Sequence, residues 1–172
     1  LLIIDGSVGC TGTLINNTDN DGKPYLLTAS HCLNKQFTMK NPDYEKIAGS
    51  IVCFFNFNSP FCDPILRGTE EMSTASTYFK AVNEMADMAL LELTATPPVY
   101  YRPYYAGWNA QEVGPAPYTC IQHPQYSVKR VSISDEDLAP FTLTDPNMIF
   151  YKNAHWHVKT WEVGYTASGS SG

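Results

Sequence analysis

Charged side chains are scarce in this 172-residue chain, accounting for only 16% of it, and the 11 Lys and Arg are outnumbered by 17 Asp and Glu. The formal net charge is −6 and no basic run occurs, which argues against nucleic acid or an anionic membrane surface as a partner. The apolar runs, such as Leu1–Ile4 and Met88–Leu91, are far too short to cross a bilayer. We therefore expect no nucleic-acid partner and no membrane insertion.

Metal-binding spacings of Cys and His are missing too. The chain has five Cys and four His, but no C-x-x-C or H-x-x-x-H accompanies them. His155 and His157 lie two apart on an expected strand and share a face, yet two ligands are too few for a metal site. We expect neither a metal nor a cofactor. Five Cys in a chain of this size indicate an oxidising compartment, and the odd number leaves one thiol without a partner in this chain.

Helical periodicity is weak, because no apolar stripe at helical spacing continues for three turns. Short segments rich in β-branched and aromatic residues, bounded by Gly, Pro, Asn and Asp, predict strands instead. The Pro- and Tyr-rich segment Thr94–Tyr105 separates two strand clusters and is expected to link two β-units. The pattern favours an all-β double barrel or a sandwich. The expected strands are Val8–Asn16, Tyr25–Ala29, Ile47–Phe57, Thr77–Val82, Met88–Leu93, Tyr118–His123, Val128–Ile133, Met148–Lys152 and His155–Trp161.

Three residues are candidates for chemistry. His31 follows a strand in "LLTASHCLN", and Asp87 in "EMADMALLEL" precedes a buried-looking run, where its carboxylate would need a donor such as an imidazole N–H. Ser171 lies in "SGSSG", where flanking glycines permit a tight turn with free backbone N–H groups. Each has a structural alternative: a buried histidine, a turn aspartate and a flexible Gly/Ser linker. The order His, Asp, Ser on an all-β chain is more specific than any one of them.

That order and its local contexts resemble the trypsin-like (chymotrypsin-fold) serine proteases, and most of all the bacterial lysyl endopeptidase branch. The segment "CTGTLINNTDNDGKPYLLTASHC" is similar to the first hairpin of that branch, and "DMALLEL", "YYAGWNAQ" and "QHPQYSVKRVSIS" are similar to later stretches. The resemblance implies that His31 is the general base, Asp87 its orienting carboxylate and Ser171 the nucleophile. It also implies an oxyanion hole from the N–H groups of Gly169 and Ser171, and a disulfide between Cys10 and Cys32.

The resemblance further implies two packed six-stranded antiparallel barrels. The first would span residues 1–96 and the second residues 106–172, with a linker at 97–105, and the second barrel would be incomplete because the chain stops just after Ser171. A C-terminal chain of the same precursor would then complete it. The implied activity is that of a secreted or periplasmic serine endopeptidase on protein or peptide substrates, cleaving after basic residues. The alternative is a non-catalytic binding module on the same scaffold.

Two departures from the trypsin pattern bear on specificity and activation. Ser170 precedes the nucleophile where many trypsin-like enzymes have Asp, so a salt bridge to a freed N-terminus is not expected. Tyr165 stands where trypsins carry the acid that binds a basic side chain.

Among the remaining cysteines, a bond between Cys53 and Cys62 would close a hairpin of workable length.

Overall fold

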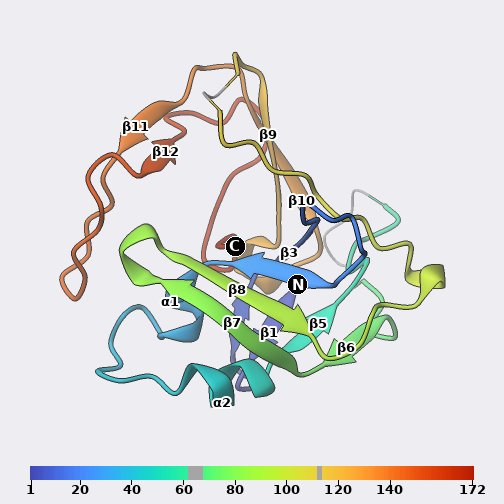
Figure 1. Cartoon of the computed structure of the whole chain (residues 1–172). Helices are drawn as coiled ribbons and strands as arrows, with labels where there is room; N and C mark the ends of the chain where they lie inside the picture. The colour runs from blue at the N-terminus through green and yellow to red at the C-terminus, as the bar shows by residue number, and fades with distance from the viewer. Residues whose placement is uncertain (62–67, 112–113) are drawn as a thin grey trace.

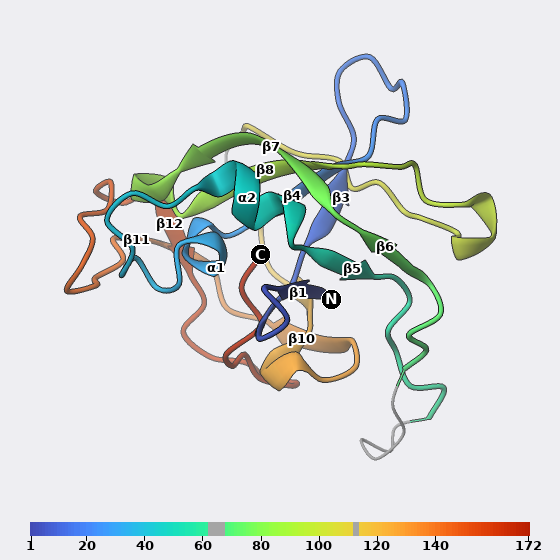
Figure 2. The same cartoon turned by 90° about the horizontal axis from the view of Figure 1, so that it is seen from below.

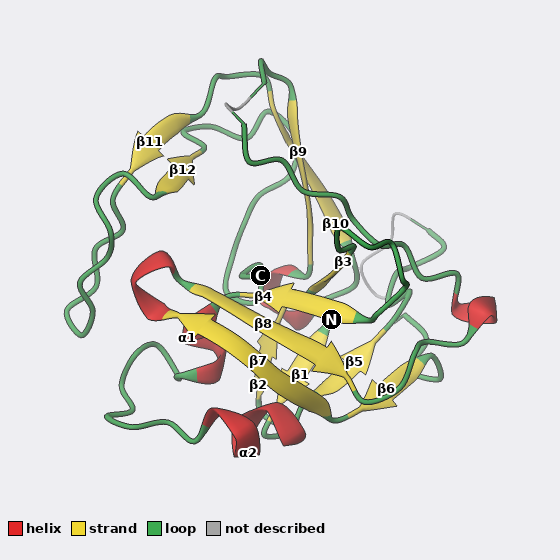
Figure 3. Cartoon of the chain, viewed as in Figure 1, coloured by secondary structure: helices red, strands yellow, loops and turns green. Residues whose placement is uncertain are grey.

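The computed structural model describes residues 1–61, 68–111 and 114–172. Short strands dominate it (Figure 3), which confirms the all-β class. The strands are β1 (Leu2–Ile4), β2 (Val8–Cys10), β3 (Thr13–Ile15), β4 (Tyr25–Thr28), β5 (Val52–Phe54), β6 (Ser73–Ala75), β7 (Thr77–Asn83), β8 (Met88–Leu93), β9 (Tyr118–Gln122), β10 (Arg130–Ser134), β11 (Ala139–Phe141) and β12 (His155–His157). The helices are α1 (Ser30–Leu33) and α2 (Tyr44–Gly49), with 3₁₀ turns η1 (Glu84–Ala86), η2 (Val99–Tyr101) and η3 (Pro124–Tyr126).

One four-stranded sheet has the order β3-β4-β8-β7 and is antiparallel throughout. Strand β8 alternates in burial, with Ala89, Leu91 and Leu93 buried and the residues between them more exposed. Leu26 of β4 lies opposite both Leu14 of β3 and Leu91 of β8. Because directly opposed residues share a face, these leucines form a row across the sheet and give it one apolar face.

The second four-stranded sheet, in the order β2-β1-β5-β6, shares its core with the first. Leu2 and Ile4 of β1 belong to the same buried cluster as Leu26 and Leu91. Helix α2 adds Ile47 to this cluster and lies against β7 (Figure 2). The largest described core therefore lies within residues 2–93 and includes residues of β4, which precedes His31, and of β8, which follows Asp87.

Two hairpins, β9–β10 and β11–β12, form separate two-stranded sheets at the top and upper left of Figure 1. Ile121 lies opposite Val131 on β9–β10, and these side chains are 59% and 48% exposed. On the other face of β10, Ser132 and Ser134 are fully buried. The described strands thus group into sheets of four, four, two and two. The closure of two six-stranded barrels stays a prediction.

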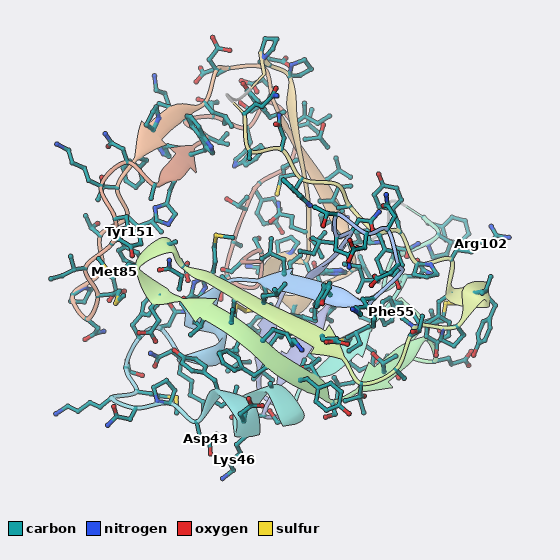
Figure 4. All side chains as sticks on the ribbon, viewed as in Figure 1. Asp43, Lys46, Phe55, Met85, Arg102 and Tyr151 are labelled. Atoms are coloured by element: carbon teal, nitrogen blue, oxygen red, sulfur yellow. A yellow bond between two sulfur atoms is a disulfide. The ribbon has the colours of Figure 1, made fainter. Side chains whose placement is uncertain are left out.

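Of the expected strand Ile47–Phe57 only Val52–Phe54 is a strand, because the segment begins in the helix α2. The Asp43 side chain accepts from the backbone N–H of Lys46 at 3.1 Å and caps α2, below the sheets in Figure 4. A capped turn with buried Ile47 and Ala48 satisfies the backbone locally, and extended structure begins only at Val52. Within the described ranges, no helix is long and apolar enough to span a bilayer.

Other expected strands differ in length. Val8–Asn16 divides into β2 and β3 because the chain passes from one sheet to the other at Thr11 and Gly12. Met148–Lys152 is not a strand, since only an isolated bridge joins Met148 to Asp145. Met88–Leu93, by contrast, is β8 with the expected bounds.

Candidate active site

His31 lies where β4 ends and α1 begins. The chain is still extended at Ala29, and Ser30–Leu33 then form one helical turn. Cys32 in this turn is bonded to Cys10 at the end of β2, with the two Cα atoms 6.4 Å apart. Closing a loop of this length contributes about 3 kcal/mol on the chain-entropy model. The expected disulfide is confirmed, and it holds the turn that presents His31.

Asp87 is placed by the turn before β8. The 3₁₀ turn η1 is capped by the side chain of Asn83, and Asp87 follows it in the left-handed region, with φ +51°. Its Oδ1 accepts from the Ser30 hydroxyl at 3.0 Å and from the His31 backbone N–H at 2.9 Å, while its Oδ2 lies 2.7 Å from His31 Nδ1. The carboxylate is therefore held by three donors, all from one end of α1.

These contacts decide the charge of Asp87. Burial by itself raises the pKa of the carboxyl, but the hydrogen bonds from the His31 ring, the His31 backbone and Ser30 outweigh it, and the pKa lies below its ordinary value. Asp87 is therefore ionised at neutral pH. Because its pKa is lowered in the folded state, it stabilises the fold above the unfolded value of about 3.9, and this contribution is lost as the pH falls through the lowered pKa.

Ser171 reaches the other side of the imidazole. Its Oγ lies 2.8 Å from Nε2 of His31, although 140 residues separate the two in sequence. An ionised carboxylate only accepts, so Nδ1 carries the hydrogen and Nε2 is free to accept from the Ser171 hydroxyl. The C-terminal segment returns to the centre of the molecule to make this contact (Figure 1). The structure thus brings together His31, Asp87 and Ser171.

The turn before Ser171 leaves two backbone donors free. The N–H of Ser170 donates to the Ala167 carbonyl, and its hydroxyl accepts from the Ala167 N–H, which closes the turn on itself. Gly169 adopts φ +90°, a conformation that favours glycine. In the described part of the chain, the N–H groups of Gly169 and Ser171 have no acceptor. Two free donors next to a serine hydroxyl can bind a developing oxyanion.

Thr11 braces this turn, and sequence reasoning missed it. Its backbone N–H donates to the Ser171 carbonyl at 2.8 Å, and its buried hydroxyl donates to the Gly169 carbonyl at 2.9 Å. The same hydroxyl accepts from the backbone N–H of His123. Thr11 follows Cys10 directly, so the disulfide and the serine turn are held at one point. A threonine in a strand-like segment carries no local signal of such a role.

The predicted bond between Cys53 and Cys62 involves Cys62, which lies outside the described residues. Cys53 is a free thiol, because its side chain points from β5 into the main core, and burial raises its pKa to about 12. Cys120 is also free.

The histidines outside the site make structural contacts. His155 Nε2 lies 3.2 Å from the Ala86 carbonyl, and the ring of His157 stacks on Phe141. Nδ1 of His123 lies 2.9 Å from the Ser127 carbonyl, and burial lowers the pKa of this histidine to about 4. Over the described ranges, no group of three or more His, Cys, Asp and Glu side chains could hold a metal ion.

Comparison with known proteins identifies the family of the chain. A family model described as "Lysyl endopeptidase, C-terminal domain" matches residues 1–172. The lysyl endopeptidase of Pseudomonas aeruginosa is 27% identical over 129 residues, which make up 74% of this chain and 26% of that protein. The chain therefore spans about a quarter of the length of this curated relative. Because the family model covers the whole sequence, the chain belongs to the lysyl endopeptidase C-terminal domain family.

Proposed function

We propose that the protein is a serine endopeptidase that hydrolyses peptide bonds by acyl transfer. The observation that supports this most directly is the pair of contacts on one imidazole, 2.7 Å from Nδ1 to Asp87 Oδ2 and 2.8 Å from Nε2 to Ser171 Oγ. Both distances lie in the range of hydrogen bonds, and the two contacts together define the tautomer of His31 that a general base requires.

The proposed mechanism uses this chain's own groups. Ser171 Oγ attacks the substrate carbonyl carbon while Nε2 of His31 takes its proton, and Asp87 stabilises the imidazolium that forms. The N–H groups of Gly169 and Ser171 bind the oxyanion of the tetrahedral intermediate. His31 then gives the proton to the leaving amine, and water repeats the sequence to release the acyl group.

The substrate class rests on the relatives alone. The name lysyl endopeptidase, borne by the Pseudomonas aeruginosa protein, supports cleavage after basic residues. Tyr165 is half exposed and its backbone carbonyl accepts from Gln122 and Ser132. No acid stands at this position to bind a basic side chain, so the selective acid would have to lie elsewhere.

We also propose the two-barrel arrangement, with a first barrel over residues 1–96, a linker at 97–105 and a second barrel from 106 onwards. Ile121 and Val131 are opposed, exposed apolar side chains on β9–β10. Their exposure supports a further segment that packs on this face, which a C-terminal chain of the same precursor would supply. The Cys10–Cys32 disulfide supports a secreted or periplasmic location, because such bonds persist in oxidising compartments.

Labelling with a fluorophosphonate probe tests the function. We expect the full-length protein to be labelled and peptide mass mapping to place the adduct on Ser171. The neighbouring serines Ser168 and Ser170 are the internal control and should remain unmodified. Peptides with Lys or Arg before the scissile bond should be cut, and matched peptides with Gln should not. A folded full-length protein that stays unlabelled would establish the binding-module alternative.

Alanine at Gly169 should impair the oxyanion donors. An added Cβ would lie 2.7 Å from the Tyr126 ring and 2.9 Å from the His123 carbonyl oxygen, at a φ that alanine rarely adopts. The turn must shift, and loss of one such donor costs about 10²- to 10³-fold in kcat. Steady-state kinetics with a peptide substrate measures this.

Gly6→Ala is the matched control for Gly169→Ala. Gly6 also has a positive φ, +66°, but no atom lies within 4 Å of an added Cβ. It should lower stability through backbone strain and leave kcat unchanged. Equal losses of kcat in the two variants would contradict the role given to Gly169.

A further inference from the structure

The turn that carries Asp87 is contacted by a segment far away in the sequence. Nε2 of His155 in β12 lies 3.2 Å from the Ala86 carbonyl oxygen, and the backbone N–H of Tyr151 donates to the Met85 carbonyl at 3.0 Å. Figure 4 shows Met85 and Tyr151 next to each other at one edge of the molecule. The second half of the chain is thus bonded to η1 immediately before Asp87.

The contact made by His155 has a defined direction. A carbonyl oxygen only accepts, so Nε2 of His155 carries the hydrogen. The other ring nitrogen, Nδ1, is buried and has no partner within the described ranges. The ring also packs edge-on against Phe150, with centroids 5.7 Å apart. The hydrogen bond to Ala86 is therefore the polar contact that orients this imidazole.

That hydrogen bond acts on the peptide unit that precedes Asp87. The N–H of this unit donates to the Glu84 carbonyl at 3.1 Å, and its C=O, which belongs to Ala86, accepts from His155. Because the peptide unit is planar, bonds at both ends fix its orientation and with it the backbone of Asp87. Asp87 has φ +51°, which few residues other than glycine adopt without such support.

A second route leads from His155 to the catalytic pair through aromatic rings. Phe150 contacts Phe37 edge-on at 5.4 Å, and Phe37 contacts the ring of His31 at 6.1 Å. Phe37 and Phe150 are both buried. His155 is therefore connected to His31 in two ways. One runs through Ala86 and Asp87, and the other through Phe150 and Phe37.

We infer that His155 is a positioning residue that aligns Asp87 with His31. The inference rests on the proposed function. It assigns to β12 a role in the geometry of the His31–Asp87 pair, whose members lie in α1 and directly after η1. The turn has other supports, because Glu84 accepts from the side chains of Asn34 and Tyr44. Loss of the His155 bond should therefore misalign Asp87 without unfolding the turn.

Kinetics of His155→Leu in the full-length protein test the inference. The variant removes the donor and should lower kcat about tenfold with little change in KM, because misalignment affects the reaction more than substrate binding. His155→Gln keeps an N–H donor near the position of Nε2 and should recover most of kcat. His157→Leu, on the same strand, is the matched control and should keep the kcat of the unmodified protein.

A proton NMR spectrum separates positioning from a general loss of stability. The downfield signal of the hydrogen between His31 Nδ1 and Asp87 should weaken in His155→Leu and persist in His155→Gln and His157→Leu. An unchanged kcat and an unchanged signal in folded His155→Leu would overturn the inference. If that variant does not fold, His155→Asn, whose amide is too short to reach Ala86, replaces it with the same expectations.

The two proposals fail in different ways. An unmodified protein that neither reacts with the fluorophosphonate nor cleaves peptides overturns the proposed function. A protein that is active but insensitive to His155→Leu overturns only the role of His155.

Discussion

Ser171→Ala is expected to lower kcat of the full-length protein by about 10⁶-fold and to abolish fluorophosphonate labelling. The variant removes the oxygen that lies 2.8 Å from His31 Nε2 but leaves the backbone N–H of residue 171 in place. The residual rate should reflect binding and the oxyanion donors alone. Single-turnover kinetics with a peptide ester, run beside the labelling assay, measures both losses.

The control for Ser171→Ala is Ser168→Ala, which changes an exposed serine in the same turn. It should retain both labelling and turnover. If Ser171→Ala instead keeps the activity of the unmodified protein, the nucleophile lies elsewhere and the contact with His31 is only structural.

Asp87→Asn is expected to lower kcat by about 10⁴-fold while KM changes little. The carboxylate accepts from His31 Nδ1 at 2.7 Å, whereas an amide can place an N–H at the same point. His31 would then carry its hydrogen on Nε2, which could no longer take the proton of Ser171. Steady-state kinetics at neutral pH measures the effect.

Asp135→Asn, at an exposed position in the second half, controls for the change in net charge. It should leave kcat unchanged, and thermal unfolding should show that Asp87→Asn is folded. A loss of less than tenfold in folded Asp87→Asn would mean that Asp87 serves only as a turn residue.

Much of the site could be predicted from the sequence because its residues lie in short, distinctive segments. The apolar run that follows Asp87 predicts β8 with its observed bounds, and the family-like hairpin indicates the disulfide of Cys10 with Cys32. Taken alone, the Gly/Ser segment around Ser171 is equally typical of a flexible linker. Only its position after the candidate His31 and Asp87 makes it a candidate nucleophile.

The residues that were missed act through tertiary contacts. Thr11 braces the serine turn through partners more than 100 residues away, and no local pattern shows this. The same holds for His155, which the sequence presents as half of a weak metal pair. The burial of the Cys53 thiol in the main core is likewise a tertiary feature that loop length alone does not predict.

The long sequence separation between His31 and Ser171 has a consequence for biosynthesis. His31 and Asp87 leave the ribosome well before Ser171, which follows His31 by 140 residues. At the usual pace of translation this is a delay of roughly ten seconds, during which the first sheets can already fold. A nascent chain that ends before Ser171 therefore holds His31 and Asp87 but lacks the proposed nucleophile. Under the proposed function, hydrolytic activity would therefore arise only once Ser171 has been synthesised and would not grow gradually with chain length.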